Sequence, residues 1–356
     1  MPSVVIPDAK DAHGDSLAAM PTSSTDGARD DLTLFRRLTG VTAIATFVLI
    51  VVGGVVRVSD SGLGCGPAGS GTEGWPLCDG QLVPFVGGST MIEFTHRVVA
   101  GIVAVLIVLL AWRAWRTMRD RPWLVRGSTF AVALVLFQAA LGGLTVEHNL
   151  HAVLVAVHLG VAMALLALLL AMYRAAEAEP EPAAAAATPG LRILAAVASF
   201  LVLATIVAGG YVAGTEGEGT ANEPVGGAHL ACGQEFPGCG DSVLPFGRDS
   251  MLDAQLTHRV LMFAAMVAVL GLVGLALARG IRTWPIAAAG GIVLLQVLLG
   301  ALNVWLGKHA GLIVGHLTLG TLLWATVVWA GLTLVEMPGR VSETVRAEVG
   351  REGATA

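Results

Sequence analysis

The sequence predicts an all-α integral membrane protein whose eight transmembrane helices form two parallel four-helix-bundle repeats. Composition, the spacing of apolar segments and an internal repeat support this fold class. The 356 residues are 55% hydrophobic and only 13% charged, whereas a soluble domain carries roughly 25% charged residues. So few charges cannot cover the surface of a soluble globule. The net charge of −5, with no basic stripe between aromatic residues, also excludes a nucleic-acid-binding protein.

Eight apolar windows of about 20 residues are each long enough to cross roughly 30 Å of hydrocarbon. These windows span residues 38–57, 95–112, 127–146, 150–172, 191–213, 256–278, 284–306 and 311–335. The first 35 residues are polar and lack a hydrophobic region, which is typical of a disordered tail rather than a signal peptide. The predicted organisation is a cytoplasmic tail (1–35), an N-terminal repeat (36–173), a flexible cytoplasmic linker rich in Glu, Pro and Ala (174–190), a C-terminal repeat (191–336) and a second cytoplasmic tail (337–356).

The basic residues predict the orientation of these spans. All but five of the 21 Lys and Arg residues fall on one side of the predicted membrane, the five being Arg57, Arg97, Arg248, Arg259 and Lys308. Cytoplasmic loops carry the excess of basic residues. We therefore expect a multi-pass protein of the cell (plasma) membrane with both termini in the cytoplasm. Two long loops, near 58–92 and 214–254, then face outward.

All four cysteines lie in these outward loops. Cys65 and Cys78 are in the first loop, and Cys232 and Cys239 are in the second. An outward compartment permits disulfides, and one pair per loop suggests two local bridges, Cys65–Cys78 and Cys232–Cys239. Free or metal-binding thiols are the alternative.

The second half of the chain repeats the first. The aligned segments are 53–56 with 209–212, 95–98 with 257–260, 138–146 with 296–304, and 151–159 with 309–317. A four-helix unit returns the chain to the side where it started, so the halves are expected to be parallel repeats about an axis along the membrane normal. One polar residue is specific to the first half, since Arg57 aligns with Ala213.

Four histidines lie inside predicted spans and recur in both halves: His96, His158, His258 and His316. Ionisable residues inside a membrane are costly and are functional by default. The four lie about 5–12 Å below the outer surface. Two imidazoles at matched depth on facing helices can ligate one haem iron axially, which predicts one haem site per half. Hydrogen-bonded packing is the alternative role.

Nearby residues fit the same hypothesis. Small residues would let a flat macrocycle approach the helices: Gly101, Gly142, Gly143 and Gly160 in the first half, and Gly300, Gly315 and Gly320 in the second. His151 and His309 stand at the entrances of their spans, where an interfacial or supporting role is expected rather than direct ligation.

The two halves differ beside the first histidine. Glu93 precedes His96 by three residues and shares its helical face, whereas the second half has Gln255 at this position. Glu93 is therefore the candidate catalytic group, as a base or as a stabiliser of a developing cation; an acid at a helix N-terminus is the alternative. Arg97 and Arg259 each suit pairing with a haem propionate, or snorkelling to outer headgroups.

Taken together, these motifs resemble the heme A synthase family over about residues 38–335. The resemblance is carried by 53–57 leading into 61–65, by 75–80, by 92–97, and by the repeated histidine and glutamine segments. It implies oxidation of a methyl group of haem O to the formyl group of haem A by successive hydroxylations, for use in terminal oxidases.

The resemblance also implies a division of labour between the halves. The pocket of His96 and His158, with Glu93 and Arg97, would take the haem O substrate. The pocket of the second half, with the iron ligands His258 and His316 and with Arg259, would keep heme b as a cofactor that relays electrons. The cysteines of the first loop match the family's outer-loop pair, although residues 66–74 lengthen the loop between them, and the second pair matches one found in only part of the family.

The implied partners are haem O, a haem O synthase, cytochrome oxidase assembly factors, an electron acceptor and the lipid bilayer, with a homo-oligomer left open. One alternative function is a di-haem b-type membrane cytochrome for quinol-linked electron transfer. That function explains four histidines but neither the difference between Glu93 and Gln255 nor the cysteine loops. Another is a transporter, which predicts sites at the membrane midplane with broken helices, whereas the polar residues here lie near the outer surface.

Overall fold

The computed structural model describes residues 23–85, 87–177, 182–216, 227–240, 242, 244–307 and 309–336. Within these ranges the long helices of the first half are α1 (Ser23–Val58), α2 (Ser89–Thr117), α3 (Pro122–Glu147) and α4 (Ala152–Ala175). A short α5 (Pro182–Ala186) leads to the second half, made of α6 (Pro189–Gly214), α7 (Ser250–Ala278), α8 (Trp284–Trp305) and α9 (Ala310–Thr333). All of these except α5 are long and apolar enough to cross a membrane, so the eight predicted spans are confirmed.

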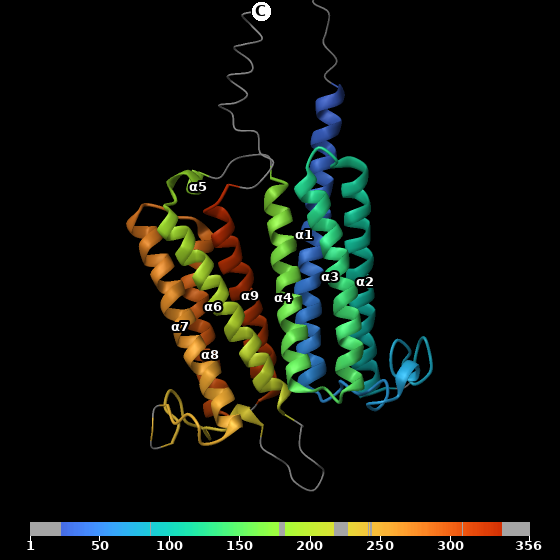
Figure 1. Ribbon diagram of the computed structural model, residues 1–356, viewed down its shortest axis with the longest axis vertical. Coiled ribbons are helices and arrows are strands. Elements are labelled where there is room, and N and C mark those ends of the chain that lie inside the picture. The colour runs from blue at the N-terminus through green and yellow to red at the C-terminus, as the bar shows by residue number, and fades with distance from the viewer. Residues whose placement is uncertain are drawn as a thin grey trace, which may run out of the picture.

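The spans form two neighbouring groups of four (Figure 1). In the first group, α1 packs on α2, α2 on α3, α3 on α4, and α4 returns to α1. The second group closes in the same way through α6, α7, α8 and α9. Contacts of α4 with α6 and α9, and of α1 with α9, join the two groups. Both cysteine loops lie at one end of the molecule and α5 lies at the other (Figure 1).

Helices are the expected form for these segments, because a spanning backbone must satisfy its polar groups internally. Three of the spanning helices have Pro in the first turn, where its missing N–H is no loss. Between the groups, Trp324 of α9 donates a buried hydrogen bond from Nε1 to the main-chain oxygen of Met163 in α4 (2.9 Å). The two groups are therefore joined by a specific polar contact as well as by apolar packing.

The predicted N-terminal tail is shorter than expected. Helix α1 begins at Ser23, so residues 23–35 are helical rather than part of a disordered tail, while residues 1–22 lie outside the described ranges. Phe35 is fully buried, and Asp31 forms an ion pair with Arg113 of α2 (2.6 Å). These tertiary contacts hold the extra turns of α1, although the local sequence is polar.

The predicted linker is also partly ordered. Residues 182–186 form α5, Ala183 and Ala184 are buried, and the oxygen of Ala184 accepts a hydrogen bond from Arg192 (3.0 Å). The expectation of a flexible linker is therefore wrong for this stretch. Residues 178–181, and the predicted C-terminal tail at 337–356, lie outside the described residues.

Candidate functional site

The four membrane histidines lie at similar depths in α2, α4, α7 and α9. Each stands about two turns from the end of its helix that is nearer the cysteine loops, or roughly 10 Å along the axis. His96 is near enough to His158 to interact electrostatically, and His316 is related in the same way to His258. Each predicted pair thus lies within one group of four helices, His96 and His158 on α2 and α4, and His258 and His316 on α7 and α9.

Each imidazole rests against a glycine of a neighbouring helix. A Cβ added to Gly53 of α1 would lie 3.2 Å from Cε1 of His96, and one added to Gly209 of α6 would lie 2.9 Å from Cε1 of His258. Normal carbon contacts are about 3.5–4.0 Å. The lack of a side chain at these glycines therefore lets the first helix of each half approach its histidine closely.

The same arrangement recurs at the second histidine of each pair. A Cβ at Gly142 of α3 would lie 3.4 Å from Cε1 of His158, and one at Gly300 of α8 would lie 3.0 Å from Cε1 of His316. Both glycines were among the small residues expected to admit a macrocycle. In the structure they make room for the imidazoles, whereas Gly101 has open space where its side chain would be.

Hydrogen bonds fix the helices around these rings. Gln138 donates from Nε2 to the main-chain oxygen of His158 (3.0 Å), and Gln296 donates in the same way to His316 (3.0 Å). Nδ1 of His258 lies 3.0 Å from the main-chain oxygen of Thr205. The two glutamines begin the repeated motif in the sequence, but sequence reasoning did not assign them this role.

The histidine pairs fit a haem better than a metal ion held by protein alone. Among the described residues, no three His, Cys, Asp or Glu side chains cluster in a way that could hold a metal ion. Two imidazoles are the axial ligand set for a haem iron, whose porphyrin supplies the other nitrogens. The Nδ1 atoms of His96, His158 and His316 are buried without a hydrogen-bond partner in the described part of the chain. These rings are therefore not saturated by protein contacts.

Glu93 is buried and fully engaged. Its Oε2 accepts a hydrogen bond from the main-chain nitrogen of Cys65 (2.8 Å), and its Oε1 accepts one from Arg97 (2.5 Å). The carboxylate thus ties α2 to the start of the first cysteine loop. Gln255, its counterpart on α7, is also buried, but its Oε1 has no partner among the described residues. Glu93 and Gln255 therefore differ in charge and also in the hydrogen bonds that their side-chain oxygens accept.

The arginine after each first histidine holds a cysteine loop. Arg97 donates to the main-chain oxygens of Gly74 and Leu77, each at 2.7 Å. Arg259 donates to the main-chain oxygens of Gly238 (2.6 Å) and Glu235 (2.9 Å) and is only 4% exposed. Snorkelling of Arg259 to outer headgroups is therefore wrong. Sequence reasoning missed these loop contacts, for which the only signal was the recurrence of an arginine and a cysteine loop in each half.

Both expected disulfides are present. Cys65 is bonded to Cys78 and Cys232 to Cys239, and no described cysteine is free. Within the first loop, Trp75 lies against α3, because a Cβ at Gly143 would be 2.9 Å from its Cδ2. The lengthened loop therefore folds back onto the end of the bundle, and the Trp75 contact was not foreseen.

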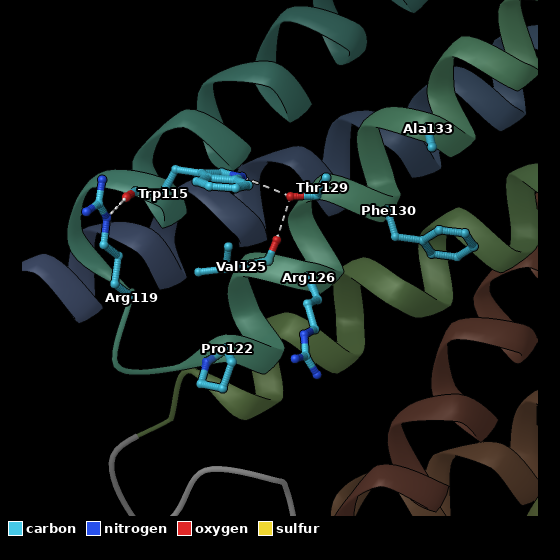
Figure 2. Close-up of a pocket in the computed structure, with 8 residues that line it drawn as sticks. All are labelled: Trp115, Arg119, Pro122, Val125, Arg126, Thr129, Phe130 and Ala133. Carbon is cyan, nitrogen blue, oxygen red and sulfur yellow. Dashed lines mark hydrogen bonds between the residues drawn. The ribbon is translucent and has the colours of Figure 1, made fainter.

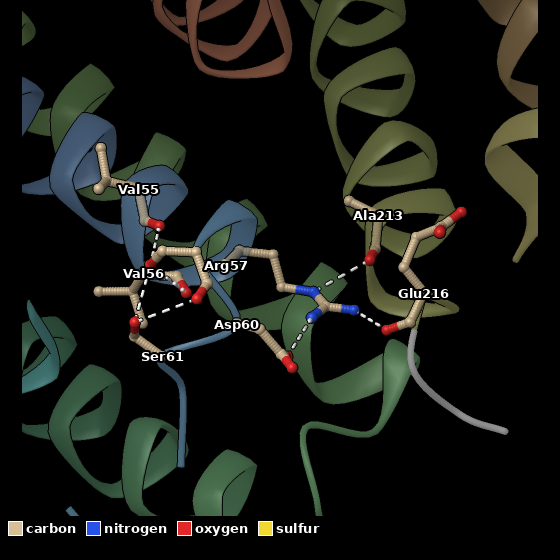
Figure 3. Close-up of polar contacts among 8 residues, drawn as sticks. Val55, Val56, Arg57, Asp60, Ser61, Ala213 and Glu216 are labelled. Carbon is tan, nitrogen blue, oxygen red and sulfur yellow. Dashed lines mark hydrogen bonds and ion pairs between the residues drawn. The ribbon is translucent and has the colours of Figure 1, made fainter. Parts of the chain in front are cut away.

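Arg57 joins the two halves at the same end of the molecule (Figure 3). Its Nε donates to the main-chain oxygen of Ala213 (3.0 Å), and its Nη2 donates to that of Glu216. Asp60 lies 4.0 Å from its Nη1. Arg57, which has no counterpart arginine in the second half, thus binds the C-terminal end of α6, the first helix of that half.

The other histidines divide between two environments. His151 and His309 are exposed at the starts of α4 and α9, as expected for interfacial residues. His229 lies in the short helical turn η2 (Ala228–Leu230), where its main-chain nitrogen donates to Oε1 of Glu216 (3.3 Å).

Comparisons with known proteins agree on one family. The family model for the cytochrome oxidase assembly protein COX15-CtaA matches residues 87–328. The chain is similar to the heme A synthase of Shouchella clausii, at 28% identity over 231 residues that cover 63% of this chain and 70% of the relative. It is also similar to the heme A synthases of Exiguobacterium sibiricum (33% over 132 residues, 36% of this chain and 42% of the relative) and Bacillus pumilus (31% over 130 residues, 35% and 39%). These last two alignments span about two fifths of the relatives' length.

Proposed function

The chain belongs to the COX15-CtaA family of cytochrome oxidase assembly proteins, and from this premise we propose that it is a heme A synthase. The reaction is the oxidation of a methyl group of haem O to the formyl group of haem A. One observation carries the assignment of the two halves. Each half has a pair of half-buried histidines seated on glycines, but among the described residues only the first pair has a buried carboxylate, Glu93, one turn away.

The first half is proposed to bind the substrate, haem O, between His96 and His158. Glu93 lies on the face of α2 that carries His96, and its contacts with Cys65 and Arg97 hold it in place. A buried carboxylate so positioned acts as a base, or stabilises positive charge that develops on the substrate. The first cysteine loop, folded onto α3 through Trp75, limits the access of water.

The second half is proposed to keep heme b between His258 and His316. When bound, this group would supply one-electron redox chemistry. The contact of His258 with the oxygen of Thr205 orients the imidazole, as partners of ligating histidines generally do. Gln255 places no charge beside the pair, which suits an electron-relay site. Nε of Arg259 is buried without a partner among the described residues, which supports its proposed pairing with a propionate; Arg97 is assigned the same role in the first half.

The halves are proposed to be parallel repeats, residues 36–173 and 191–336, about an axis along the membrane normal. The recurrence of histidine–glycine and glutamine–carbonyl contacts in both halves supports this relation. The arginine-rich end, which carries α5, is assigned to the cytoplasm by the distribution of basic residues. Haem O synthase, oxidase assembly factors and an electron acceptor are the proposed partners.

Pigment analysis tests the proposal. The full chain is expressed together with a haem O supply, and the haems in the membrane and in the purified protein are identified. We expect hydroxymethyl or formyl haem with the wild type, and bound but unoxidised haem with Glu93→Gln. Glu147→Gln, at the C-terminal end of α3, is the matched control and keeps turnover. A wild type that accumulates no oxidised haem rules out the synthase and leaves the di-haem cytochrome; full activity in Glu93→Gln removes Glu93 from the mechanism.

Spectra of histidine variants test the assignment of the two pockets. His258→Ala and His316→Ala should each lose the resident b-type spectrum, because one axial ligand is removed. His96→Ala should keep that spectrum and lose turnover. The opposite pattern would mean that the substrate and cofactor pockets are exchanged.

A further inference from the structure

A groove runs between the end of α2 and the start of α3, at the end of the molecule away from the cysteine loops (Figure 2). Its volume is about 800 Å³. Val125, Phe130 and Ala133 of α3 and Trp115 of α2 supply its apolar lining. Trp115 and Phe130 are 53% and 57% exposed. The groove therefore opens outward from the bundle, toward the membrane, and is separate from the histidine pairs.

Two arginines line the rim of this groove, Arg119 at the end of α2 and Arg126 in the first turns of α3 (Figure 2). Arg119 uses only Nε, which donates to the main-chain oxygen of Trp115 (2.9 Å). Neither arginine has an acidic partner among the described residues, since neighbouring Asp120 is 3.9 Å from Arg121 instead. The rim thus carries two positive charges that no described carboxylate neutralises.

The length of the groove matches one leaflet of a bilayer. Pro122 and Ala133 mark its ends on α3, and eleven helical residues rise about 16 Å. This is roughly half of the 30 Å hydrocarbon thickness. The indole Nε1 of Trp115 donates to the hydroxyl of Thr129 (3.0 Å), which satisfies both polar groups. An acyl chain therefore meets an apolar wall, with the positive charges at one end.

The second half lacks these features at the aligned positions. Alignment on the first histidines places Leu277 at the position of Trp115 and Ile281 at that of Arg119. Alignment on the glutamines places Trp284 at the position of Arg126. Ile281 is only 4% exposed, so no charge replaces Arg119 there. The groove residues Trp115, Arg119 and Arg126 are therefore not repeated at the aligned positions of the second half.

We propose that this groove binds an anionic phospholipid, with one acyl chain along α3 and the phosphate at the end of the groove that carries Arg119 and Arg126. Basic pockets between membrane helices on the cytoplasmic side are suited to anionic headgroups. Arginine also matches phosphate with paired N–H donors. This site is independent of the proposed function, because it needs neither haem nor turnover.

Native mass spectrometry of the purified full chain tests the proposal, with phosphatidylglycerol and phosphatidylcholine added at equal concentrations. We expect about tenfold stronger retention of phosphatidylglycerol by the wild type, from two arginines near the membrane surface. Arg119→Gln combined with Arg126→Gln should reduce retention to that of phosphatidylcholine. The matched control, Arg279→Gln with Arg282→Gln at the α7–α8 turn, should keep the wild-type ratio. Equal retention of both lipids by the wild type, or the same loss in the control, overturns the proposal.

A second variant tests the acyl part of the site. Ala133→Trp fills the apolar end while both arginines remain, and it should also lower the retention of phosphatidylglycerol. Millimolar inorganic phosphate should not displace the lipid; displacement would mean that the rim binds free anions. The substituted residues are exposed, and circular dichroism with the elution profile verifies that each variant is folded. Unchanged retention in both groove variants contradicts the site.

Discussion

Gly209→Ala is expected to loosen the haem pocket of the second half, because it fills the space that His258 occupies. The added Cβ would lie 2.9 Å from Cε1 of the imidazole and 3.2 Å from Nδ1. Carbon atoms normally stay about 3.5–4.0 Å apart, so the ring must withdraw by roughly 0.6 Å or more. This movement changes the 3.0 Å distance between Nδ1 and the main-chain oxygen of Thr205, and so weakens that hydrogen bond.

The size of the effect follows from these contacts. Overpacking of a closely packed interior costs about 1–3 kcal/mol, and a weakened hydrogen bond adds up to about 1 kcal/mol. The total is about 1–4 kcal/mol, and since roughly 1.4 kcal/mol corresponds to a tenfold change in affinity, haem retention should fall by about 5- to 700-fold. The overall helical fold should persist, because the overlap is confined to one ring.

The assay is the haem-to-protein ratio of the purified variant, followed by titration with added haem. Gly300→Ala, with a Cβ contact of 3.0 Å, should be nearly as damaging, and Gly142→Ala, at 3.4 Å, should be mild. Gly101→Ala is the matched control in α2, because nothing lies within 4 Å of its Cβ position. Equal retention in Gly209→Ala and Gly101→Ala would refute the reasoning from the glycine contacts.

Three further predictions concern the loops and the contact between the halves. Arg97→Ala removes the donor to two loop oxygens and to Glu93, so limited proteolysis should cut the first loop faster; a wild-type cleavage rate would contradict this clamp. Cys65→Ser should impair haem oxidation more than Cys232→Ser, because only the first loop is tied to the carboxylate; the reverse ranking counts against this link. Arg57→Ala should destabilise the protein by about 2 kcal/mol, since it removes charged donors to the end of α6. Thermal unfolding in detergent measures the last effect, and an unchanged melting temperature would show that the contact contributes nothing.

Much of the fold follows from the sequence, because the membrane imposes a simple pattern. Helices are required in hydrocarbon, and windows of about 20 apolar residues reveal them. The start of α1 did not follow, since its first turns are polar and are held by tertiary contacts such as the ion pair of Asp31 with Arg113. Helix α5 could not be predicted either, because it depends on the burial of alanines that have no distinctive pattern in the sequence.

The candidate site divides in the same way. The four histidines could be found from the sequence because ionisable groups are rare inside apolar windows and these recur. The loop contacts of Arg97 and Arg259 could not be predicted, since their acceptors are main-chain oxygens, which every residue has. The bond from Cys65 to Glu93 also requires the fold, which brings residues 28 positions apart within 2.8 Å.

The contact between Arg57 and Ala213 limits how alike the two halves can be. The guanidinium bonds the main chain at the very position that aligns with its own in the other half. A second arginine at residue 213 would therefore bring two like charges together in the same partly buried space. Two identical halves that associate as separate chains would have to place an arginine at both positions or at neither. Joining the halves in one polypeptide removes this restriction, because one half can supply the donor and the other the acceptor.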